Sequence, residues 1–390
     1  MNQRNDGTNA LIGIDARPLS AACKRQGGGG IGTYARELLR AWPRSRAERL
    51  ALLGVAEDVA ACQLPAAVMM LDGTPLLQGA LNDHWRAPRT LARAGARVAW
   101  YPSQLQAPLH QPLPTVITVH DLIPQKYEEL YPADAKERVR QRLMEIACAR
   151  ATQLIAVSTA TQRDLTGLWC VPAEKITVIH EAPRPVFCQP VPPAALARVR
   201  SAYALPDRFW LYVGGMDPRK TLAVALAGAG TLPVEQRLPW LILAGNREAG
   251  AETALLAAAR TAGVAVRIAG PVPEADLPGL YAAATALVMP TRDEGCSLPV
   301  LDALAAGLPV IASAAGAIPE MAGAAYHPVH EETAAAWGAA MAAVSDPNRQ
   351  AQLRIAGPQQ VAPLSWEKAA TATAAILQQA IRRVKNGDGA

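Results

Sequence analysis

The sequence is poor in several features that mark particular classes of protein. Aromatic residues make up 5% of its 390 residues, and only two are Phe, so a core must be packed largely with aliphatic and small side chains. The six cysteines form no CxxC pair, and none stands at metal-ligand spacing from a histidine. Neither a disulfide framework nor a zinc site is therefore indicated. A reducing cytosol is the simplest compartment for such a chain.

Long apolar runs and strongly charged blocks are also missing. The polar start, MNQRNDGTN, leads into LIGIDARPL, whose apolar part is far too short for a signal sequence or a membrane helix. The net charge of +5 is modest. It suits an anionic substrate or an anionic membrane surface, and it does not favour nucleic acid as a partner.

What the sequence does contain is the composition of a globular α/β protein. Hydrophobic residues make up 51% and charged residues 18%. The length exceeds one ordinary domain, so we expect two, each with its own core. Short apolar runs alternate with amphipathic segments, and no solenoid repeat is visible. This alternation predicts two doubly wound α/β domains.

The most informative stretch is residues 288–313, VMPTRDEGCSLPVLDALAAGLPVIAS. An apolar run that closes at Met289 predicts a buried strand, and helical spacing of apolar residues begins at Leu298. Pro299 suits the first helical turn, and the helix is expected to end at Gly307 before another buried strand, VIA. The stretch is thus a β-loop-α-β unit, with its loop at the carboxyl end of a strand where ligands bind in open α/β sheets.

Two carboxylates flank the start of this helix. The free N–H groups of a helix N-terminus favour an anion such as a diphosphate. Glu294 precedes the helix and Asp302 lies one turn inside it. Carboxylates accept hydrogen bonds from hydroxyl groups, so the pair suits the binding of a sugar or ribose. Either acid alone is more often an ordinary solvated side chain, and it is their combination that favours a site.

Two cations occupy a strand-to-helix corner earlier in the same half. The run FWLYVGGMDPRKT predicts a buried strand, a Gly-Gly turn and a helix that begins near Thr221. Arg219 and Lys220 therefore lie at a helix N-terminus, where fixed cations are unfavourable unless an anion lies between them. The corner predicts a phosphate clamp, with a merely solvated corner as the alternative.

A histidine and an aspartate follow a strand in the first half. The run TVITVHDLIP, residues 115–124, is β-branched and apolar, which predicts a buried strand that delivers His120 and Asp121 to its carboxyl end. A lone histidine is usually structural, but a His-Asp pair at a strand end is a better candidate for a site.

A glycine-rich segment raises a rival interpretation. Residues 17–26 are expected to form a loop that runs into QGGGGIG before a helix over residues 33–42. Gly27, Gly29 and Gly32 formally satisfy GxGxxG, the pattern of an NAD-dependent oxidoreductase. The glycines lie about ten residues beyond the strand instead of in its tight turn, and no acid closes a second strand at the required distance, so we discount that function.

Together these stretches resemble the family-4 retaining glycosyltransferases of GT-B fold. The family signature is a Glu, seven residues and a second Glu, then a small-residue helix and a Gly-x-Pro-Val-Ile turn. Here Glu294 takes the first position and Asp302 the second, while Cys296 and Ser297 stand where the family more often has an aromatic residue or Gly. The resemblance implies two Rossmann-like domains that face each other across a cleft.

The resemblance also implies a role for each site residue. The second acid contacts the ribose of the donor nucleotide in that family, and the histidine reaches toward the donor sugar. Gly215 stands where the family sometimes has a further basic residue. The expected catalytic residues are His120, Arg219, Lys220 and Glu294, and the expected donor-binding residues are Gly30, Gly32, Gly215, Gly295, Cys296, Ser297, Leu298 and Asp302. No metal and no cofactor beyond the nucleotide-diphosphate sugar is expected.

Domain boundaries follow from composition. Residues 1–185 are expected to form an acceptor domain and residues 207–363 a nucleotide-sugar domain. The proline-rich run APRPVFCQPVPPAAL places a linker at residues 186–206. Residues 364–390 are expected to carry an amphipathic helix that crosses back to the first domain, as in GT-B proteins.

The expected reaction is retaining transfer of a hexose, with mannose from GDP-mannose favoured by the resemblance alone. The acceptor would be a saccharide or a polyprenyl-linked saccharide in bacterial polysaccharide biosynthesis. Alternatives are a non-catalytic GT-B scaffold subunit and, less favoured, the oxidoreductase. Location in the cytoplasm is expected, with reversible contact to the anionic inner face of the membrane through the basic helix at residues 133–150. A helix face balanced by its own acids is an equal alternative there.

Overall fold

A computed structural model shows how these stretches fold. It describes residues 10–19, 29–43, 49–62, 68–72, 79, 81–247, 250–270 and 272–385. The chain divides into two compact units. Unit 1 comprises Met1–Glu181 together with Ser365–Ala390, and unit 2 comprises Ala182–Leu364.

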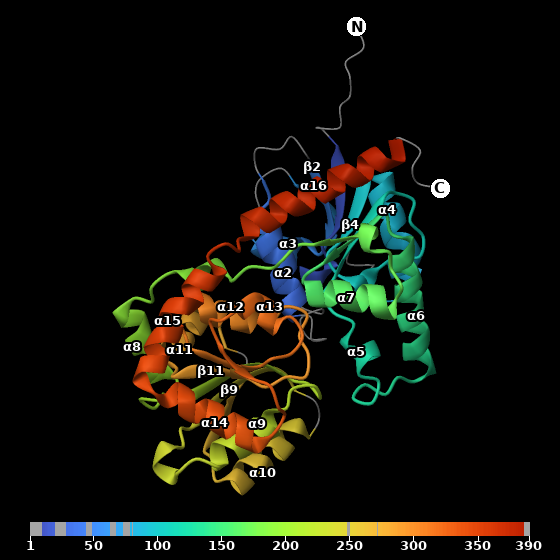
Figure 1. The fold of residues 1–390 in the computed structure, drawn as a ribbon. Coiled ribbons are helices and arrows are strands. Elements are labelled where there is room, and N and C mark those ends of the chain that lie inside the picture. The colour runs from blue at the N-terminus through green and yellow to red at the C-terminus, as the bar shows by residue number, and fades with distance from the viewer. Residues whose placement is uncertain are drawn as a thin grey trace. The chain divides into compact units, whose positions relative to one another are not determined.

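Unit 1 is built on a seven-stranded parallel sheet of order β3-β2-β1-β4-β5-β6-β7 (Figure 1). Its strands are β1 Leu11–Asp15, β2 Arg49–Gly54, β3 Val68–Asp72, β4 Val98–Tyr101, β5 Thr115–Val119, β6 Gln153–Ala156 and β7 Ile176–Val178. The strands β1, β4, β5 and β6 are buried along their whole length. This burial explains why they read as continuous apolar runs, as parallel strands covered on both faces do.

The helices of unit 1 cover this sheet. They are α2 Gly29–Arg40, α3 Ala56–Ala61, α4 Ala87–Arg93, α5 Ile123–Lys126, α6 Ala135–Arg150, α7 Thr159–Leu168 and α16 Trp366–Lys385, with short turns η1 Arg17–Leu19, η3 Asn82–Arg86, η4 Gln104–Gln106 and η5 Ala173–Lys175. Ser158 caps α7, because its hydroxyl accepts a hydrogen bond from the Thr161 amide at 3.1 Å.

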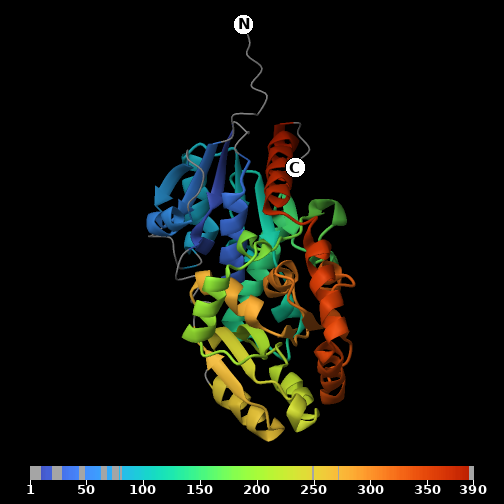
Figure 2. The same cartoon turned by 90° about the vertical axis from the view of Figure 1, so that its left-hand side faces the viewer.

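The last helix, α16, belongs to unit 1 although unit 2 precedes it in the chain. It contacts α2 and strands β4, β5 and β6, and Figure 2 shows it lying along that unit. The ring of Trp366 packs edge-on against Tyr34 at a centroid distance of 6.0 Å. Arg383 donates a hydrogen bond to the side-chain oxygen of Gln153 at 2.9 Å.

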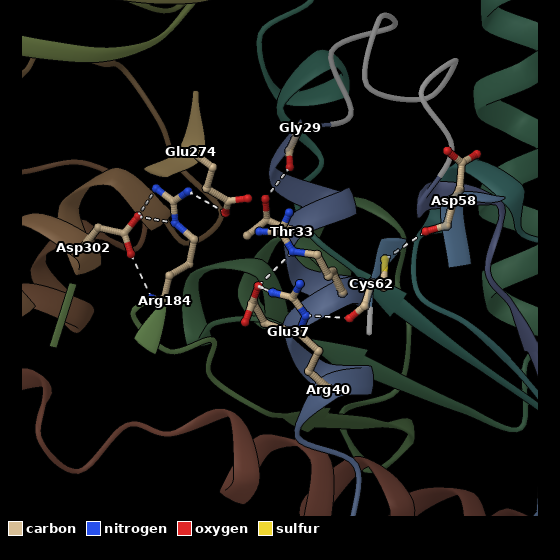
Figure 3. A network of polar contacts seen from close by, with 10 residues as sticks. Gly29, Thr33, Glu37, Arg40, Asp58, Cys62, Arg184, Glu274 and Asp302 are labelled. Carbon is tan, nitrogen blue, oxygen red and sulfur yellow. Dashed lines mark hydrogen bonds and ion pairs between the residues drawn. The ribbon is translucent and has the colours of Figure 1, made fainter. Parts of the chain in front are cut away.

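The glycine segment folds differently from the prediction. Helix α2 begins at Gly29, so Gly30 and Gly32 lie inside a helix and not in a loop, while Gly27 lies outside the described residues. A side chain at Gly32 would come within 3.1 Å of the Pro18 carbonyl oxygen, so close packing explains this glycine. The helix is further held by Glu37, which accepts hydrogen bonds from the guanidinium groups of two arginines on the same helix (Figure 3).

Unit 2 contains a six-stranded parallel sheet of order β10-β9-β8-β11-β12-β13. Its strands are β8 Trp210–Met216, β9 Trp240–Arg247, β10 Val266–Ala269, β11 Ala286–Met289, β12 Val310–Ser313 and β13 His327–Val329. Its helices are α8 Pro193–Ala202, α9 Leu222–Gly230, α10 Ala251–Ala262, α11 Leu277–Ala283, α12 Leu298–Ala305, α13 Ile318–Ala322, α14 Ala334–Ser345 and α15 Pro347–Val361, with turns η6 Pro185–Cys188, η7 Val234–Gln236 and η8 Glu274–Asp276.

The proline-rich segment also differs from the prediction. Residues 193–202 of the expected linker form helix α8, because proline is well tolerated in a first helical turn. Val199 is buried, and it lies so close to Gly279 that a side chain there would come within 2.8 Å of it. The helix is therefore packed onto α11 and is part of unit 2. The division between the two units falls before Ala182.

Strand β8 departs from expectation at its end. It continues through Gly214 and Gly215 to Met216 with an irregular register, where the sequence suggested a turn. The Tyr212 hydroxyl donates a hydrogen bond to the Gly215 carbonyl oxygen at 2.7 Å, so this carbonyl has a partner within the protein. None of the helices in the described ranges combines the length and the hydrophobicity that crossing a membrane requires.

Candidate active site

The β-loop-α-β unit forms as predicted, and it places an open helix end at the edge of the sheet in unit 2. Strand β11 ends at Met289 and α12 begins at Leu298. The preceding residue, Ser297, adopts a left-handed backbone with φ 70° and ψ 68° and offers no side-chain cap to the helix. Pro299 has no N–H, and the Val300 and Leu301 amides donate to the Ser297 carbonyl oxygen, so the Leu298 amide is the N–H of the first turn that can face an external acceptor such as a phosphate.

The expected donor-binding residues of this loop differ in their burial. Cys296 and Ser297 are buried, whereas Gly295 and Leu298 are half-buried. The Ser297 hydroxyl is buried, and it has no hydrogen-bond partner within the part of the chain that the structure describes. A buried hydroxyl with unused hydrogen-bonding capacity at a helix N-terminus suits a ligand with acceptor oxygens.

Replacing Ser297 by glycine should raise stability and weaken binding of the donor. A non-glycine residue in the left-handed region costs about 1 kcal/mol or more, and glycine removes that cost. We expect an increase in the free energy of unfolding by urea of up to about 1 kcal/mol, with a higher KM for the donor. The matched Ser201→Gly substitution, at an exposed position in the last turn of helix α8, should lower stability instead. A destabilised Ser297→Gly protein would show that the strain is absent.

The loop that carries Glu294 is held by a close backbone approach. The Ala317 amide donates a hydrogen bond to the Glu294 carbonyl oxygen at 2.9 Å. Gly316 has φ 57°, and a side chain there would lie 2.5 Å from the Glu294 amide nitrogen. Sequence reasoning missed this glycine, whose signal was its place in the AAGAIP loop directly after β12. Only glycine fits both the backbone angle and the space.

The two predicted cations meet Glu294 in one cluster. The Lys220 ammonium pairs with Glu294 Oε1, and Arg219 Nη2 lies 3.7 Å from Glu294 Oε2. Arg219 is held in turn by Asp217, at 2.9 Å, and by the Asp293 carbonyl oxygen, at 3.1 Å. The structure thus brings together three of the four residues predicted to be catalytic, at the carboxyl edge of the sheet in unit 2.

Burial and charge act in opposite directions on this cluster. Burial raises the pKa of Glu294, but the attraction of Lys220 and Arg219 outweighs it, so the pKa of Glu294 is lowered. Burial also lowers the pKa of the Lys220 ammonium, with the neighbouring Arg219 charge adding to the effect. Asp217 and Glu294 together balance the charges of Arg219 and Lys220, so the positive end of the α12 dipole is what favours binding of an anion beside the cluster.

Asp302 differs from its expected role. Its side chain is 0% exposed, and both of its oxygens accept hydrogen bonds from Arg184. The Arg184 backbone amide reaches Oδ1 at 2.9 Å, and the guanidinium reaches Oδ2 at 2.9 and 2.6 Å (Figure 3). In this structure a buried ion pair thus engages the Asp302 carboxylate, for which the resemblance implied a contact with ribose. No local pattern indicates this ion pair, since the two residues are 118 positions apart.

His120, the fourth residue, lies at the end of β5 in unit 1 and is 8% exposed. Its Nε2 lies 2.8 Å from the Pro102 carbonyl oxygen, and its Nδ1 lies 3.3 Å from Glu181 Oε1. The ring of Tyr34 packs edge-on at a centroid distance of 4.9 Å. Two acceptors facing both ring nitrogens favour the doubly protonated, charged imidazolium, because a neutral ring carries one N–H.

The charge on His120 has a definite pH dependence. Burial lowers its pKa, but the hydrogen bond and charge of Glu181, helped by Pro102 and Asp121, outweigh burial and raise it. A raised pKa means that the pair stabilises unit 1 fully below the ordinary value of about 6.5 and ceases to do so as pH rises through the pKa of the folded chain.

Glu181→Gln should therefore lower the pKa of His120 and remove this pH-dependent stabilisation. The imidazole resonances titrated by NMR report the pKa, and thermal unfolding from pH 5 to 9 reports the stability. Glu174→Gln, on the exposed turn η5 of the same unit, is the control and should leave the titration unchanged. An unchanged His120 titration in Glu181→Gln would show that the two side chains are not coupled.

No group of three or more His, Cys, Asp or Glu side chains arranged to hold a metal ion occurs within the described ranges.

Comparison with known proteins places the chain in a class. The model of the Glycosyltransferase Family 4 domain matches residues 28–182, and that of the Glycosyl transferases group 1 domain matches residues 207–346. The chain belongs to the family-4 glycosyltransferases and has their two-domain α/β GT-B fold. This assignment excludes the oxidoreductase interpretation. The helical conformation of Gly29 and Gly32 also argues against a dinucleotide-binding turn.

Two curated relatives show the range of activities among similar sequences. The O-antigen chain mannosyltransferase B of Escherichia coli is 32% identical over 198 residues, which cover 50% of this chain and 51% of that protein. A D-inositol 3-phosphate glycosyltransferase of Thermobispora bispora is 29% identical over 285 residues, which cover 70% of this chain and 66% of that protein. The chain thus spans about half the length of the first relative and less than two thirds of that of the second.

Solved structures confirm the fold. The Anabaena protein Alr3699/HepE in complex with UDP and glucose superposes with a TM-score of 0.73 at 15% identity, covering 95% of this chain and 100% of that one. WaaG, a glycosyltransferase involved in lipopolysaccharide biosynthesis, gives 0.70 at 16% identity and covers 94% and 99%. At 15–16% sequence identity, these similarities are evidence for the fold alone.

Proposed function

We propose that this protein transfers a hexose from a nucleotide-diphosphate sugar to a saccharide or lipid-linked saccharide, with retention of configuration, in the synthesis of a bacterial polysaccharide. The observation that carries the proposal is the cluster of Lys220, Arg219 and Glu294 beside the open N-terminus of α12. Two fixed cations and the positive end of the α12 dipole provide what a diphosphate needs.

The cluster can stabilise the departure of the nucleoside diphosphate. As the C1–O bond to the phosphate breaks, negative charge grows on the leaving oxygen, and Arg219, Lys220 and the positive end of the α12 dipole stabilise it. The acceptor oxygen forms its bond to C1 from the same face, and its proton passes to the leaving phosphate. No protein nucleophile is needed, and Glu294 would position the transferred sugar through its hydroxyl groups.

The choice of donor rests on the relatives. The Escherichia coli relatives are named as mannosyltransferases and the actinobacterial relatives as inositol-phosphate glycosyltransferases. We therefore propose mannose from GDP-mannose as the first donor to test. His120 is proposed to act on the donor sugar, as the family resemblance implies.

A panel of nucleotide sugars and nucleoside diphosphates tests the proposal. We expect GDP-mannose and GDP to raise the melting temperature, because a ligand that binds only the folded chain stabilises it by mass action. Transfer to a mannosylated acceptor should then follow with the same donor. A chain that binds donors but never turns them over would instead be the non-catalytic scaffold.

We propose separately that the protein contacts membranes, and the structure reduces the number of basic residues on α6 that could do so. In the basic helix α6, Arg140 pairs with Glu137 at 2.6 Å, and Arg142 pairs with Glu145. These pairs cancel part of the positive charge, which leaves Lys136, Arg138 and Arg150 to attract an anionic surface. Sedimentation with liposomes containing anionic lipid should show weak binding that disappears with salt. Equal sedimentation with neutral liposomes would count against it.

A further inference from the structure

The sheet of unit 1 has a topological switch point of its own. In the order β3-β2-β1-β4-β5-β6-β7, the strand order changes direction between β1 and β4. Ligands of open α/β sheets bind at such a point, outside the carboxyl ends of the strands. In unit 2 the switch point lies between β8 and β11, the strands that Lys220 and Glu294 follow. The same rule therefore predicts a second ligand site at the carboxyl ends of β1 and β4.

A buried ion cluster occupies this point in unit 1. Asp15 ends β1, and Arg17 donates to both of its oxygens, at 2.8 Å from Nε and 2.5 Å from Nη2. Nη1 of Arg17 donates to Oδ1 of Asp83 at 2.6 Å. The side chains of Asp15 and Arg17 are 0% and 4% exposed, whereas that of Asp83 on η3 is 26% exposed. Two carboxylates thus contact one guanidinium, which holds the more accessible of them in place.

Two buried polar atoms without partners belong to the same elements. Tyr101 ends β4 and is 0% exposed, yet its hydroxyl has no hydrogen-bond partner in the ranges that the structure describes. Burial raises the pKa of Tyr101, and the charges of Asp15, Arg17 and Asp83 also act on it, so the hydroxyl lies near the ion cluster. Nδ1 of His84 on η3 is buried and has no partner in those ranges either. Buried polar atoms are seldom unpaired, so these two indicate a polar ligand.

The ion cluster lies close to His120. Strand β4 pairs with β5, and His120 directly follows the last residue of β5. Nε2 of His120 lies 2.8 Å from the carbonyl oxygen of Pro102, the residue after Tyr101. Because neighbouring strands are about 4.8 Å apart, a sugar bound at the end of β4 would lie beside the histidine proposed to act on the donor sugar.

We propose that the carboxyl ends of β1 and β4 bind the terminal sugar of the acceptor, that Asp83 and the Tyr101 hydroxyl bind its hydroxyl groups, and that this sugar carries no phosphate. This inference rests on the proposed function, because it assumes that a saccharide is the acceptor. A carboxylate has about four acceptor positions, so Asp83 can bind a hydroxyl while Arg17 holds it. Arg17 and Asp15 act as positioning residues for that carboxylate.

The charges at this point favour an uncharged sugar over a sugar phosphate. Phosphate sites present cations and N–H donors, whereas two carboxylates with one guanidinium repel a further anion. The arginines that follow on η3 and α4 are exposed. Arg86 donates to Asn82 Oδ1 at 3.4 Å, and the Arg89 guanidinium lies 5.5 Å from the ring centre of Trp85. A sugar hydroxyl suits the cluster better, because it can donate to a carboxylate and accept from a tyrosine hydroxyl.

Acceptors with and without a phosphate test the inference. Methyl mannobiosides, each also prepared with a phosphate on the terminal mannose, are assayed with GDP-mannose or the donor that the nucleotide-sugar panel selects. The proteins are the wild type, Asp83→Asn, Tyr101→Phe and the control Glu174→Gln, whose turn η5 precedes β7 and so lies at the amino edge of the sheet. We expect the wild type and the control to have a kcat/KM about tenfold or more higher for the uncharged acceptors, because like charges repel.

The two variants should change acceptor binding in different ways. Asp83→Asn should raise the acceptor KM about tenfold or more, the loss typical of a hydrogen bond to a charged group, and should weaken the discrimination against phosphate. Tyr101→Phe should raise the acceptor KM about threefold or more, while its melting temperature stays the same or rises, because the hydroxyl removed has no partner in the free chain. GDP should raise the melting temperature of all four proteins equally.

Two results would overturn the inference and leave the proposed function standing. One is an unchanged acceptor KM in both Asp83→Asn and Tyr101→Phe, and the other is a wild type that prefers the phosphorylated acceptors. A wild type that glycosylates no acceptor of either kind would count against the proposed function, and the inference would fail with it.

Discussion

Lys220→Ala is expected to lower turnover by roughly 10²-fold or more, because a donor that stabilises developing charge typically contributes that much. Affinity for the nucleoside diphosphate should fall as well, since the ammonium is buried beside the start of α12, where its attraction to an anion is little screened. Steady-state kinetics with one donor and calorimetry with GDP measure the two effects.

The loss of Lys220 also leaves Glu294 with a weaker partner, so a folding defect must be separated from a catalytic one. Lys220→Arg keeps the charge and should keep the fold, with part of the activity, because the guanidinium has a different shape. Arg267→Ala removes an exposed cation from β10 in the same unit and should leave turnover unchanged. Wild-type turnover in folded Lys220→Ala would remove the diphosphate clamp from the account.

Asp302→Ala is expected to cause the largest loss of stability. Removing one partner of a buried ion pair leaves the other charge uncompensated and typically costs about 3 to 5 kcal/mol. The pair joins the first residues of unit 2 to helix α12, so urea unfolding should show its midpoint shifted to lower concentration. The matched control is Glu332→Ala, whose partner Arg292 is equally exposed and whose pair should contribute no more than about 1 kcal/mol.

A double variant separates the charge from the packing. Replacing Arg184 by Met and Asp302 by Leu removes both charges while keeping apolar volume, and such replacements of buried pairs are often neutral or stabilising. We expect this variant to be more stable than Asp302→Ala alone. Equal stability of Asp302→Ala and Glu332→Ala would contradict the buried pair, because it would mean that Asp302 is solvated.

The elements with strong local signals could be predicted from the sequence. The buried run LIGID became β1, and the spacing from Leu298 became α12, because apolar periodicity and proline placement act within a few residues. The meeting of Lys220 with Glu294 could also be predicted, since both follow the carboxyl ends of neighbouring parallel strands. The order of the strands brings Lys220 and Glu294 together, and the family resemblance predicted that order.

Tertiary partners could not be predicted. Arg184 lay in the proline-rich run just before the predicted linker, and nothing local to it indicates a partner on α12. Glu181 was unremarkable in the run ITVIHEAP, although it pairs with His120. The linker itself was misjudged because proline breaks a helix only in its interior, and α8 carries Pro193 in its first turn.

The most direct test of the central claim is the fate of GDP-mannose and the other donors of the panel with the purified 390-residue chain and a mannosylated acceptor. Proton NMR follows both the release of nucleoside diphosphate and the configuration at C1 of the product. Our account predicts equimolar release of nucleoside diphosphate and a product with the same anomeric configuration as the donor. Inversion at C1, or a folded chain that neither binds nor consumes any nucleotide sugar, would contradict it.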